Sequence, residues 1–521
     1  MKLGIDFGTT RIVVAAVDRG NYPLVHFETP DGVYDEWFPS LVSVRPPKGG
    51  SNGSMERAER RYGWDAWQGQ SEPGWVNLRS IKRYLEHAGP ETRLSLHGEQ
   101  VPITELLHGL LSSLRSALAA QFGAKEPFEA MLGVPANANT NQRFLTVDAF
   151  RRAGFSVLGL LNEPSAASIE FGHRQKSKGR ILVYDLGGGT FDVSLVSMAD
   201  GTHTVLASEG ISNLGGDDFD IVLAELAAGR EVLHSLTLAE MFRLDEECRR
   251  QKEALHPNSR KIVIDLDVAR EGLGQAVVPV AEFYEHCRPL LDESLALALK
   301  LARGENIEAL YVTGGGSELP LVTRILREEF GRKVTRSEYT RSATAIGLAI
   351  QADSASGYRL REMFTRDFGV WREGQGGERM IFDPIFLRGT RLPSAGDPPL
   401  AVNRVYRPVH NIGDFRYIEA SHLGNQGEPA GDIAVWDEIL FPFDPALRHT
   451  TSLEGLPVTR SQAVAAEEIE ESYACDAAGV VKVTIRNLTS SYSREFSLGR
   501  WSGKAAVVAP SAGKRARRAA R

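Results

Sequence analysis

The sequence predicts a mixed α/β fold made of two similar halves, followed by an all-β module. Residues 4–17 and 181–196 share one pattern: an apolar run, an acid, a turn of glycine and threonine, and a second apolar run. Strand and helix patterns then alternate as far as residue 352, which is typical of α/β proteins. From residue 380 onward, short alternating runs separated by Pro and Gly clusters predict a β-sandwich.

The composition indicates the class of protein, its kinds of partner and its cellular compartment. The 521 residues are enough for two to four domains, and 42% hydrophobic with 24% charged residues is ordinary for a globular protein. The net charge of −7 argues against nucleic acid as the main partner. No apolar run reaches the roughly 18 residues that span a membrane, and the N-terminus lacks a signal-peptide pattern. Three scattered cysteines (Cys248, Cys287 and Cys475) do not suit a disulfide framework, so we expect a cytoplasmic protein without membrane partners.

Apolar spacing predicts the elements of the first part in order. Six leucines between 106 and 118 recur at helical spacing. Further helices are predicted over 141–153, 164–172, 224–229, 238–255, 283–302, 319–330 and 343–351. Strands outside the two hairpins are predicted over 130–135, 155–161, 262–268, 276–280 and 310–316.

The second part is predicted from strand spacing alone. Its runs are 380–388, 400–409, 415–421, 433–441, 469–475, 480–486 and 494–501. We therefore predict a nucleotide-binding domain over 1–352, a linker over 353–379, a β-sandwich over 380–503 and a basic disordered tail over 504–521.

The two hairpin turns have the chemistry of a phosphate site. Glycines without a Cβ let backbone N–H groups approach a phosphate closely, as at Gly187, Gly188 and Gly189. Asp185 and Asp192 stand at the mouth of this hairpin, where carboxylates could hold a hydrated Mg²⁺. Because the first hairpin repeats the pattern, the pair predicts a duplicated fold that clamps one nucleotide from both sides.

Seven segments in order justify a family comparison. They are Gly4–Thr10, Ile81–Arg83, Gly133–Ala136 with Gln142-Arg143, Asn162–Ala167, Val183–Asp192, Leu214–Asp220 and Val312–Gly316. With these motifs, residues 1–352 resemble the nucleotide-binding domain of the 70-kDa heat-shock (DnaK-type) chaperones, within the actin/hexokinase ATPase superfamily. The resemblance implies a duplicated actin-like, ribonuclease-H-like fold that uses ATP or ADP with Mg²⁺.

The resemblance also implies a role for each matching residue. Lys82 would orient the attacking water, and Glu163, Asp192 and Thr190 would complete its hydrogen-bond shell. Asp6 and Asp185 would hold Mg²⁺ mostly through water, and Pro135 with Arg143 would relay the nucleotide state to the next domain. The remaining nucleotide contacts would come from Gly8, Thr9, Thr10, Gly187, Gly188, Gly189, Gly215, Gly216, Lys252, Gly314, Gly315 and Gly316.

Several of these residues also have simpler interpretations. Lys82 beside Arg83 could be a solvated charge, and Glu163 could be a carboxylate at a helix start. Pro135 could merely end a strand, and Arg143 could lie on a helix surface. The Asp6/Asp185 pair is hardest to explain otherwise, because two carboxylates at the ends of buried strands are costly without a cation.

The base side and the linker depart from the family pattern. Glu318 stands where an arginine would stack on adenine, and Arg249 and His256 replace a glutamate and a serine. Arg341-Ser342 replaces an acidic pair, which leaves either a working ATP site with altered base contacts or a weak or switched nucleotide preference. Residues 357–367 replace the usual leucine-rich linker with a more charged segment.

The main functional prediction is a divergent chaperone-type ATPase without the helical lid, because about 20 residues follow Trp501. It would hydrolyse ATP slowly and bind a peptide or unfolded protein client weakly, with a co-chaperone or exchange factor as a further partner. A small-molecule kinase of the same superfamily and a non-catalytic, nucleotide-clamped scaffold are the alternatives.

Overall fold

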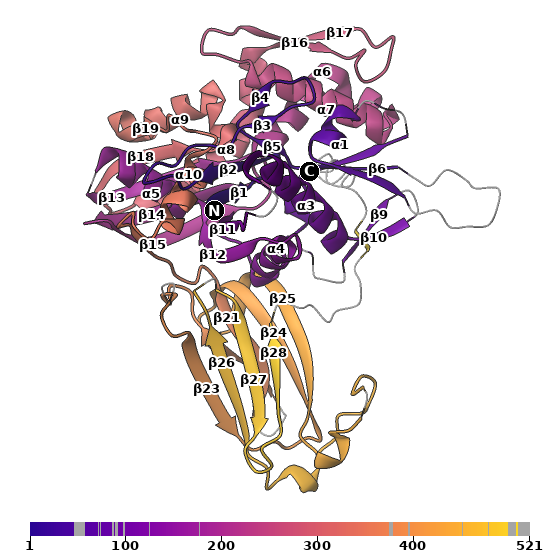
Figure 1. Cartoon of the computed structure of the whole chain (residues 1–521), viewed down its shortest axis with the longest axis vertical. Helices are drawn as coiled ribbons and strands as arrows, with labels where there is room; N and C mark the ends of the chain where they lie inside the picture. Colours follow the sequence, from indigo (N-terminus) through magenta and orange to yellow (C-terminus); the bar gives the residue numbers. More distant parts are fainter. Residues whose placement is uncertain are drawn as a thin grey trace, which may run out of the picture.

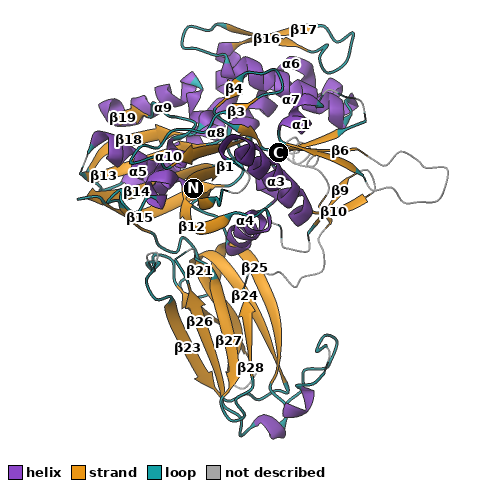
Figure 2. Ribbon diagram, viewed as in Figure 1, coloured by secondary structure: helices purple, strands orange, loops and turns teal. Residues whose placement is uncertain are grey.

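The fold is described from a computed structural model of the chain. It describes residues 1–498 apart from 46–57, 71, 73, 86–87, 89–91, 97–98, 124–125, 177, 375–378, 394–395, 451 and 478, together with the backbone of 507–508. Figure 1 and Figure 2 show a larger part of mixed helices and strands and an elongated part made of strands. We refer to residues 1–361 as the α/β region and to residues 367–498 as the β region.

The first hairpin lies inside a five-stranded sheet. Strand β1 (Lys2–Phe7) pairs antiparallel with β2 (Arg11–Ala16), and Asp6 lies opposite Val13. On the other side of β1, two parallel strands follow, β11 (Glu129–Val134) and β12 (Ser156–Asn162), and β5 (Phe38–Pro39) borders β2.

The second hairpin repeats this arrangement in a six-stranded sheet. Strand β13 (Gly179–Leu186) pairs antiparallel with β14 (Phe191–Ala199), and Asp185 lies opposite Asp192. The parallel strands β18 (Ile307–Thr313) and β19 (Val334–Arg336) follow β13, while β15 (Thr202–Ile211) borders β14. Both predicted hairpins therefore form, each with the same neighbours in the same order.

Helices cover both sheets, and one of them joins the sheets together. The larger helices are α3 (Ile103–Phe122), α4 (Thr140–Arg152), α5 (Glu163–Gln175), α6 (Gly216–Ser235), α7 (Leu238–Glu253), α8 (Val280–Ala302), α9 (Pro320–Phe330) and α10 (Ala343–Ala352). Helix α10 crosses α5 so closely that a Cβ at Gly347 would lie 1.8 Å from the carbonyl oxygen of Ala166. It also packs against β1, where a Cβ at Gly4 would lie 2.2 Å from the nitrogen of Ala349. This packing brings the two hairpin turns to one place.

Each sheet has its own core. Apolar side chains of β1, β2, α3 and α4 form the first, and those of β13, β14, α6, α8 and α9 form the second. The predicted helix over 224–229 begins earlier than expected, since α6 starts at Gly216, where Asp218 caps the main-chain N–H of Gly215. That polar, glycine-rich start hid the first turns of the helix from the apolar spacing.

Smaller elements complete the α/β region. Helix α1 (Trp64–Gln68) and strands β6 (Leu41–Arg45), β7 (Glu59–Tyr62) and β8 (Val76–Arg79) precede the short helix α2 (Ile81–Tyr84). The two-stranded units are β3 (Phe27–Glu28) with β4 (Tyr34–Asp35) and β16 (Lys261–Asp265) with β17 (Gln275–Pro279). Strand β9 (Arg93–Leu96) pairs with β10 (Glu99–Pro102) and with β29 (Val507–Val508), the only described residues of the predicted tail over 504–521.

The β region consists of two four-stranded antiparallel sheets that share one core. One sheet has the order β22-β21-β24-β25 and the other β23-β26-β27-β28. Their bounds are β21 (Asp367–Gly374), β22 (Arg379–Phe386), β23 (Leu400–Tyr406), β24 (Ile412–Leu423), β25 (Pro429–Pro442), β26 (Ile469–Cys475), β27 (Val481–Asn487) and β28 (Ser493–Ser497). All seven expected strands therefore form within the described residues, and residues 499–501 of the last expected run lie outside them.

The linker predicted over 353–379 is too long, because two strands lie within it. Strand β20 (Arg359–Arg361) pairs in parallel with β15, and β21 is an inner strand of the first β-region sheet. Phe368 and Val370 are fully buried in β21, but the charges around them disguised the alternation. Arg388 of the β region contacts the α/β region by donating hydrogen bonds to Ser208 and Glu209 of β15.

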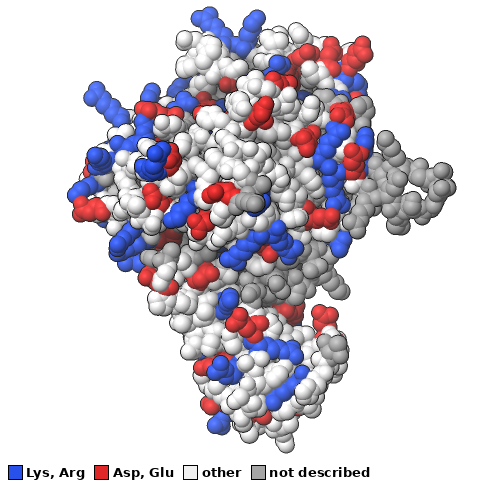
Figure 3. All heavy atoms as spheres, viewed as in Figure 1, with Lys and Arg blue, Asp and Glu red and all other residues white. Residues whose placement is uncertain are grey.

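The surface carries no evident segregation of charge on the face shown in Figure 3, where basic and acidic side chains are interspersed. Within the described part of the chain, no helix is both long and apolar enough to cross a membrane.

Candidate functional site

A cleft opens between the two hairpin turns. It is lined by residues from both sheets, from α2, from the start of α5 and from α7. Of the residues predicted from the sequence, those at the cleft are Asp6, Gly8, Thr9, Thr10, Lys82, Glu163, Asp185, Gly187, Gly188, Thr190, Gly216, Lys252, Gly314, Gly315 and Gly316. Residues more than 300 positions apart in the sequence thus meet around one space.

Glycine is required where the two turns approach each other. A Cβ at Gly188 would lie 2.5 Å from Oγ1 of Thr10, and one at Gly189 would lie 2.7 Å from Cγ2 of Thr9. The third turn approaches just as closely, because a Cβ at Gly314 (φ 84°) would lie 2.4 Å from Oδ1 of Asp185. The three turns can therefore approach this closely only because glycine stands at these positions, and Gly188 and Gly314 line the cleft.

Lys82 lies in the cleft as a buried ion pair with Glu163. Burial alone would lower the pKa of Lys82, but the negative charges of Glu163 and Asp6 outweigh it and raise that pKa. Lys82 is therefore a fixed cation at the centre of the site. Its interpretation as a solvated charge is excluded by its 4% exposure.

Several carboxylates lie around the single ammonium group of Lys82. Burial, followed by the charge of Glu163, raises the pKa of both Asp6 and Asp192 to about 7. The same two causes raise the pKa of Asp185 well above its ordinary value. The buried carboxylates of Glu163, Asp185 and Asp192 and the half-buried carboxylate of Asp6 thus surround one ammonium group, and this excess of acidic groups favours a bound cation.

A magnesium ion suits this set of donors. Mg²⁺ prefers oxygen ligands and usually keeps several waters, so it needs only one or two protein carboxylates. Among the described residues, no three or more His, Cys, Asp or Glu side chains are grouped to hold a metal ion. A hydrated ion held by Asp6 and Asp185 fits both observations.

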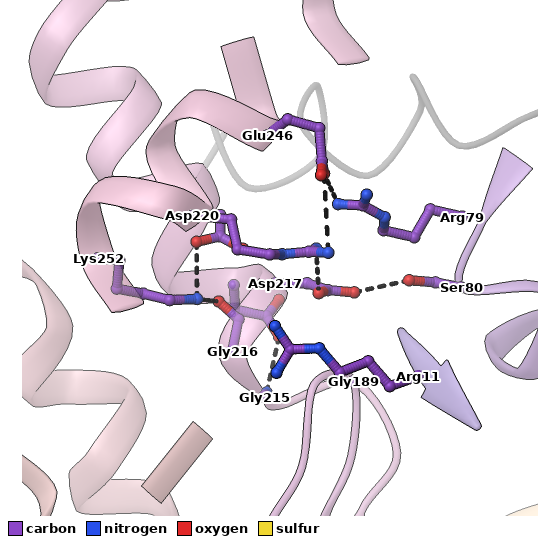
Figure 4. Close-up of polar contacts among 12 residues, drawn as sticks. Arg11, Arg79, Ser80, Gly189, Gly215, Gly216, Asp217, Asp220, Glu246 and Lys252 are labelled. Carbon is purple, nitrogen blue, oxygen red and sulfur yellow. Dashed lines mark hydrogen bonds and ion pairs between the residues drawn. The ribbon is translucent and has the colours of Figure 1, made fainter. Parts of the chain in front are cut away.

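Helix α6 is fastened to the second hairpin turn at its first residues. The N–H of Gly216 donates to the carbonyl of Gly187 at 3.0 Å, and that of Asp217 donates to Gly188 at 2.8 Å. Lys252 of α7 donates to the carbonyl of Gly216 at 2.6 Å and pairs with Asp220 at 2.6 Å (Figure 4). The turn is thereby held from behind by two helices.

The segment around Lys82 spans the cleft through contacts that the sequence analysis missed. Ser80 has a left-handed backbone (φ 61°), and its Oγ donates to Asp217 at 2.7 Å (Figure 4). Arg83 donates to the carbonyl of Gly189 and to Asp218, and Arg79 pairs with Glu246. No local sequence signal indicates these partners, since they lie more than 100 residues away.

Some predicted residues lie outside the cleft lining. Oδ1 of Asp192 accepts a hydrogen bond from the N–H of Ala136 at 2.9 Å, and Gly189 and Gly215 lie where the second turn meets α6. Pro135 and Arg143 stand further away. Arg143 is buried, not a surface residue, and donates to Oδ1 of Asn162 at 2.6 Å.

Arg143 and Asn162 meet a residue that the sequence analysis did not single out. Glu362, just after β20, accepts hydrogen bonds from the main-chain N–H of Asn162 at 3.0 Å and from its side chain at 2.5 Å. Asn162 directly precedes Glu163, the partner of Lys82. One strand-to-helix junction therefore contacts the cleft on one side and the segment leading to the β region on the other.

Comparisons with known proteins agree with this geometry. The family model described as Hsp70 protein matches residues 82–370, which is more than half of the chain. The chain is 32% identical over 429 residues to a protein named Chaperone protein HscA homolog from Polynucleobacter necessarius, and 29% identical over 424 residues to its namesake from Methylibium petroleiphilum. Each alignment covers 76% of this chain and 65% of the relative, so the chain spans about two-thirds of the relatives' length. The chain therefore belongs to the Hsp70 protein family.

Proposed function

We propose that this chain is a Mg²⁺-dependent ATPase of the chaperone type, which couples its nucleotide state to the binding of a peptide or unfolded protein. The observation that carries the proposal is the buried Lys82–Glu163 pair between two glycine turns at one cleft. Relatives named as chaperones support it. The small-molecule kinase and scaffold alternatives gain no comparable support.

The phosphate end of the cleft has the groups that phosphoryl transfer needs. Transfer of a γ-phosphoryl group depends mainly on positioning and on stabilising charge. The turns at Gly8–Thr10 and Gly187–Thr190 would surround the β- and γ-phosphates. Lys82, fixed by Glu163, would hold the attacking water and offset charge on the phosphate.

Asp6 and Asp185 would hold Mg²⁺ through its water shell. When bound, the ion would neutralise charge on the phosphate oxygens. Glu163 would accept a hydrogen bond from the attacking water and, through Lys82, keep that water in line. Asp192 would act from the second hairpin strand, as part of the electrostatic environment of Lys82.

We further propose that residues 1–361 are a duplicated actin-like domain and that the β region is a β-sandwich that binds the client. The matching order of the two sheets supports the first part, and the shared core of the two four-stranded sheets supports the second. The junction of Asn162 and Glu163, with Arg143 and Glu362, would couple the two regions. A co-chaperone or nucleotide-exchange factor would be a further partner.

Steady-state ATP hydrolysis by the full chain, with and without Mg²⁺, tests the proposal. We expect a slow Mg²⁺-dependent rate in the wild type, and Lys82→Ala should lower it by about a hundredfold or more, the effect of removing one transition-state donor. ATP binding measured by calorimetry should persist in this variant. Lys178→Ala, at an exposed lysine, is the matched control and should retain the wild-type rate.

A wild type that does not hydrolyse ATP would overturn the ATPase proposal. Client binding is tested separately, by the anisotropy of a labelled apolar peptide in the presence of ATP or ADP. We expect the two nucleotides to change the peptide's dissociation rate differently. Identical rates would refute the coupling between the two regions.

A further inference from the structure

A buried tyrosine and a buried glutamate meet inside the α/β region. Tyr311 of β18 is 2% exposed, and Glu170 of α5 is 1% exposed. The phenol of Tyr311 donates a hydrogen bond to Oε2 of Glu170, and Nη1 of Arg174 lies 3.7 Å from the other oxygen. Burial, and then the negative charge of Glu170, raises the pKa of Tyr311. The phenol therefore keeps its proton and remains a donor to a carboxylate that would be costly to bury without one.

The same phenol anchors the loop that leads into α10. We refer to residues 337–342, between β19 and α10, as the 337–342 loop. Tyr311 is hydrogen-bonded to Oγ of Ser337 at 2.7 Å, and this oxygen also accepts the main-chain N–H of Tyr339 at 3.0 Å. The carbonyl of Ser337 accepts a hydrogen bond from Oγ1 of Thr340 at 2.9 Å. The loop is thereby tied to Tyr311 at its first residue.

The 337–342 loop holds the third glycine turn at the cleft. The carbonyl of Thr340 accepts hydrogen bonds from the N–H of Gly314 at 2.8 Å and from Oγ1 of Thr313 at 3.1 Å. Thr340 also lines the cleft itself. Gly314 has little room to move, because a Cβ there would already lie 2.3 Å from the carbonyl oxygen of Leu186. A shift of the loop would therefore be passed on to the wall of the cleft.

Helix α5 connects this anchor to the proposed catalytic pair. Glu163 and Glu170 lie two turns apart on α5, which is about 10 Å along the helix axis. Glu163 pairs with Lys82, while Glu170 accepts the hydrogen bond from Tyr311. The whole stretch of α5 that carries both glutamates is buried. One buried helix therefore sets the position of the 337–342 loop relative to Lys82.

We propose that Glu170 and Tyr311 are positioning residues, which hold the 337–342 loop where a bound nucleotide needs it. They act through Thr340 and the glycine turn at Gly314, since neither of them is among the described residues that line the cleft. The inference rests on the proposed nucleotide function. It deepens that function by naming two residues that set the strength of nucleotide binding without contacting the nucleotide.

Steady-state ATP hydrolysis by the full chain with Mg²⁺ tests the inference. Tyr311→Phe removes one oxygen atom, so the 337–342 loop loses its anchor. The KM for ATP should rise about fivefold, the change that corresponds to one net hydrogen bond. The value of kcat should stay within about twofold, because Lys82 and Glu163 keep their pairing and only binding is weakened.

Tyr184→Phe is the matched control. Tyr184 is an equally buried tyrosine on the neighbouring strand β13, and its phenol is hydrogen-bonded to Ser294 at 2.6 Å. This variant also loses one buried hydrogen bond, but it should leave the KM for ATP unchanged. An equal KM in Tyr311→Phe and Tyr184→Phe would overturn the inference.

A double variant separates positioning from stability. Tyr311→Phe alone leaves Glu170 buried without its donor, so urea unfolding should show a less stable fold. Adding Glu170→Met replaces both polar partners by apolar groups, so stability should recover while the KM for ATP stays raised. Recovery of the KM together with the stability would mean that the pair is merely structural. Glu170→Gln, which keeps an acceptor for Tyr311, should raise the KM less than Glu170→Met.

Calorimetry with ATP distinguishes failure of this inference from failure of the proposed function. We expect the wild type to bind ATP and Tyr311→Phe to bind it about fivefold more weakly. If both bind ATP with the same Kd, the positioning role is wrong and the nucleotide function stands. A wild type that binds no ATP would overturn the nucleotide function and this inference with it.

Discussion

Arg83 donates hydrogen bonds from Nε and Nη2 to the carbonyl oxygen of Gly189, at 3.1 and 2.8 Å. The contact crosses the cleft from α2, next to Lys82, to the turn of the second hairpin. The same guanidinium reaches Asp218 at 2.9 Å, which caps Gly215 at the start of α6. One arginine therefore fixes the distance between the proposed catalytic lysine and the turn that would hold phosphate.

Replacing this arginine should lower turnover more than it weakens binding. Hydrogen bonds to a charged group contribute about 1.5–3 kcal/mol, so Arg83→Ala should reduce kcat about ten- to hundredfold, with KM for ATP changed less than threefold. Arg83→Lys should recover little, because an ammonium cannot reproduce the forked contact. The measurement is a steady-state ATPase assay at several ATP concentrations.

Arg19→Ala in the exposed turn after β2 provides the control for that experiment. A rise in KM with unchanged kcat for Arg83→Ala would show that the residue only supports binding. It would then have no part in placing Lys82.

Loss of the Glu362 carboxylate should release the segment between the two regions. Glu362 accepts both donors of Asn162, and Glu362→Ala would leave those buried donors without this acceptor. A hydrogen bond to a charged group contributes about 1.5–3 kcal/mol. We therefore expect this segment to open about ten- to hundredfold more often in Glu362→Ala than in the wild type. Limited trypsin digestion would report this as faster cleavage at Arg359 and Arg361 of β20.

Glu454→Ala, in an exposed loop of the β region, is the matched control for the digestion. Equal cleavage rates in Glu362→Ala and the wild type would mean that β20 is held by its pairing with β15 alone. The proposal that Asn162 couples the α/β region to the β region would then be wrong.

The sequence predicted the hairpins and most strands because their signals are local. At Gly187–Gly189, the glycines, the flanking apolar runs and the acids stand next to one another, so the pattern itself carries the information. Strand β21 was missed for the opposite reason. Its buried residues Phe368 and Val370 alternate with charged and small neighbours that suggested a linker.

The contacts that complete the site could not be predicted in the same way. Arg83 and Gly189 are 106 residues apart, and Asn162 and Glu362 are 200 apart. Such pairs depend on how α10 and the two sheets pack, which no local spacing records. Glu318 could be identified as a departure from the family, but its partner Arg341 becomes evident only from the fold.

Acidification should destabilise the fold through His203 of β15. Burial lowers the pKa of His203 from 6.5 to about 4, so the unfolded chain binds a proton that the folded chain does not. The stabilisation from the neutral imidazole is complete above about pH 6.5 and is lost as the pH falls toward 4. At about 1.4 kcal/mol per pH unit, lowering the pH from 6.5 to 5 should remove about 2 kcal/mol.

Urea unfolding at pH 7 and pH 5 measures this loss. His203→Gln should show a smaller difference between the two pH values than the wild type, whatever its absolute stability. His234→Gln, at an exposed position of α6, should behave like the wild type. An undiminished pH effect in His203→Gln would assign the acid sensitivity to other groups.

The buried Arg372–Glu471 pair should determine the stability of the β region. Arg372 donates two hydrogen bonds to Glu471, at 2.9 and 2.7 Å, and the Glu471 side chain is completely buried between the two sheets. Arg372→Met would leave a buried carboxylate without its cation, which typically destabilises a fold by about 3–5 kcal/mol. Adding Glu471→Gln to that variant removes the charge and should restore part of the lost stability.

Hydrogen exchange of peptides from β26 and β27 measures both changes in stability, with the exposed Arg416→Met as the control. If the double variant is no more stable than Arg372→Met alone, packing of the arginine side chain, and not its charge, stabilises the sandwich.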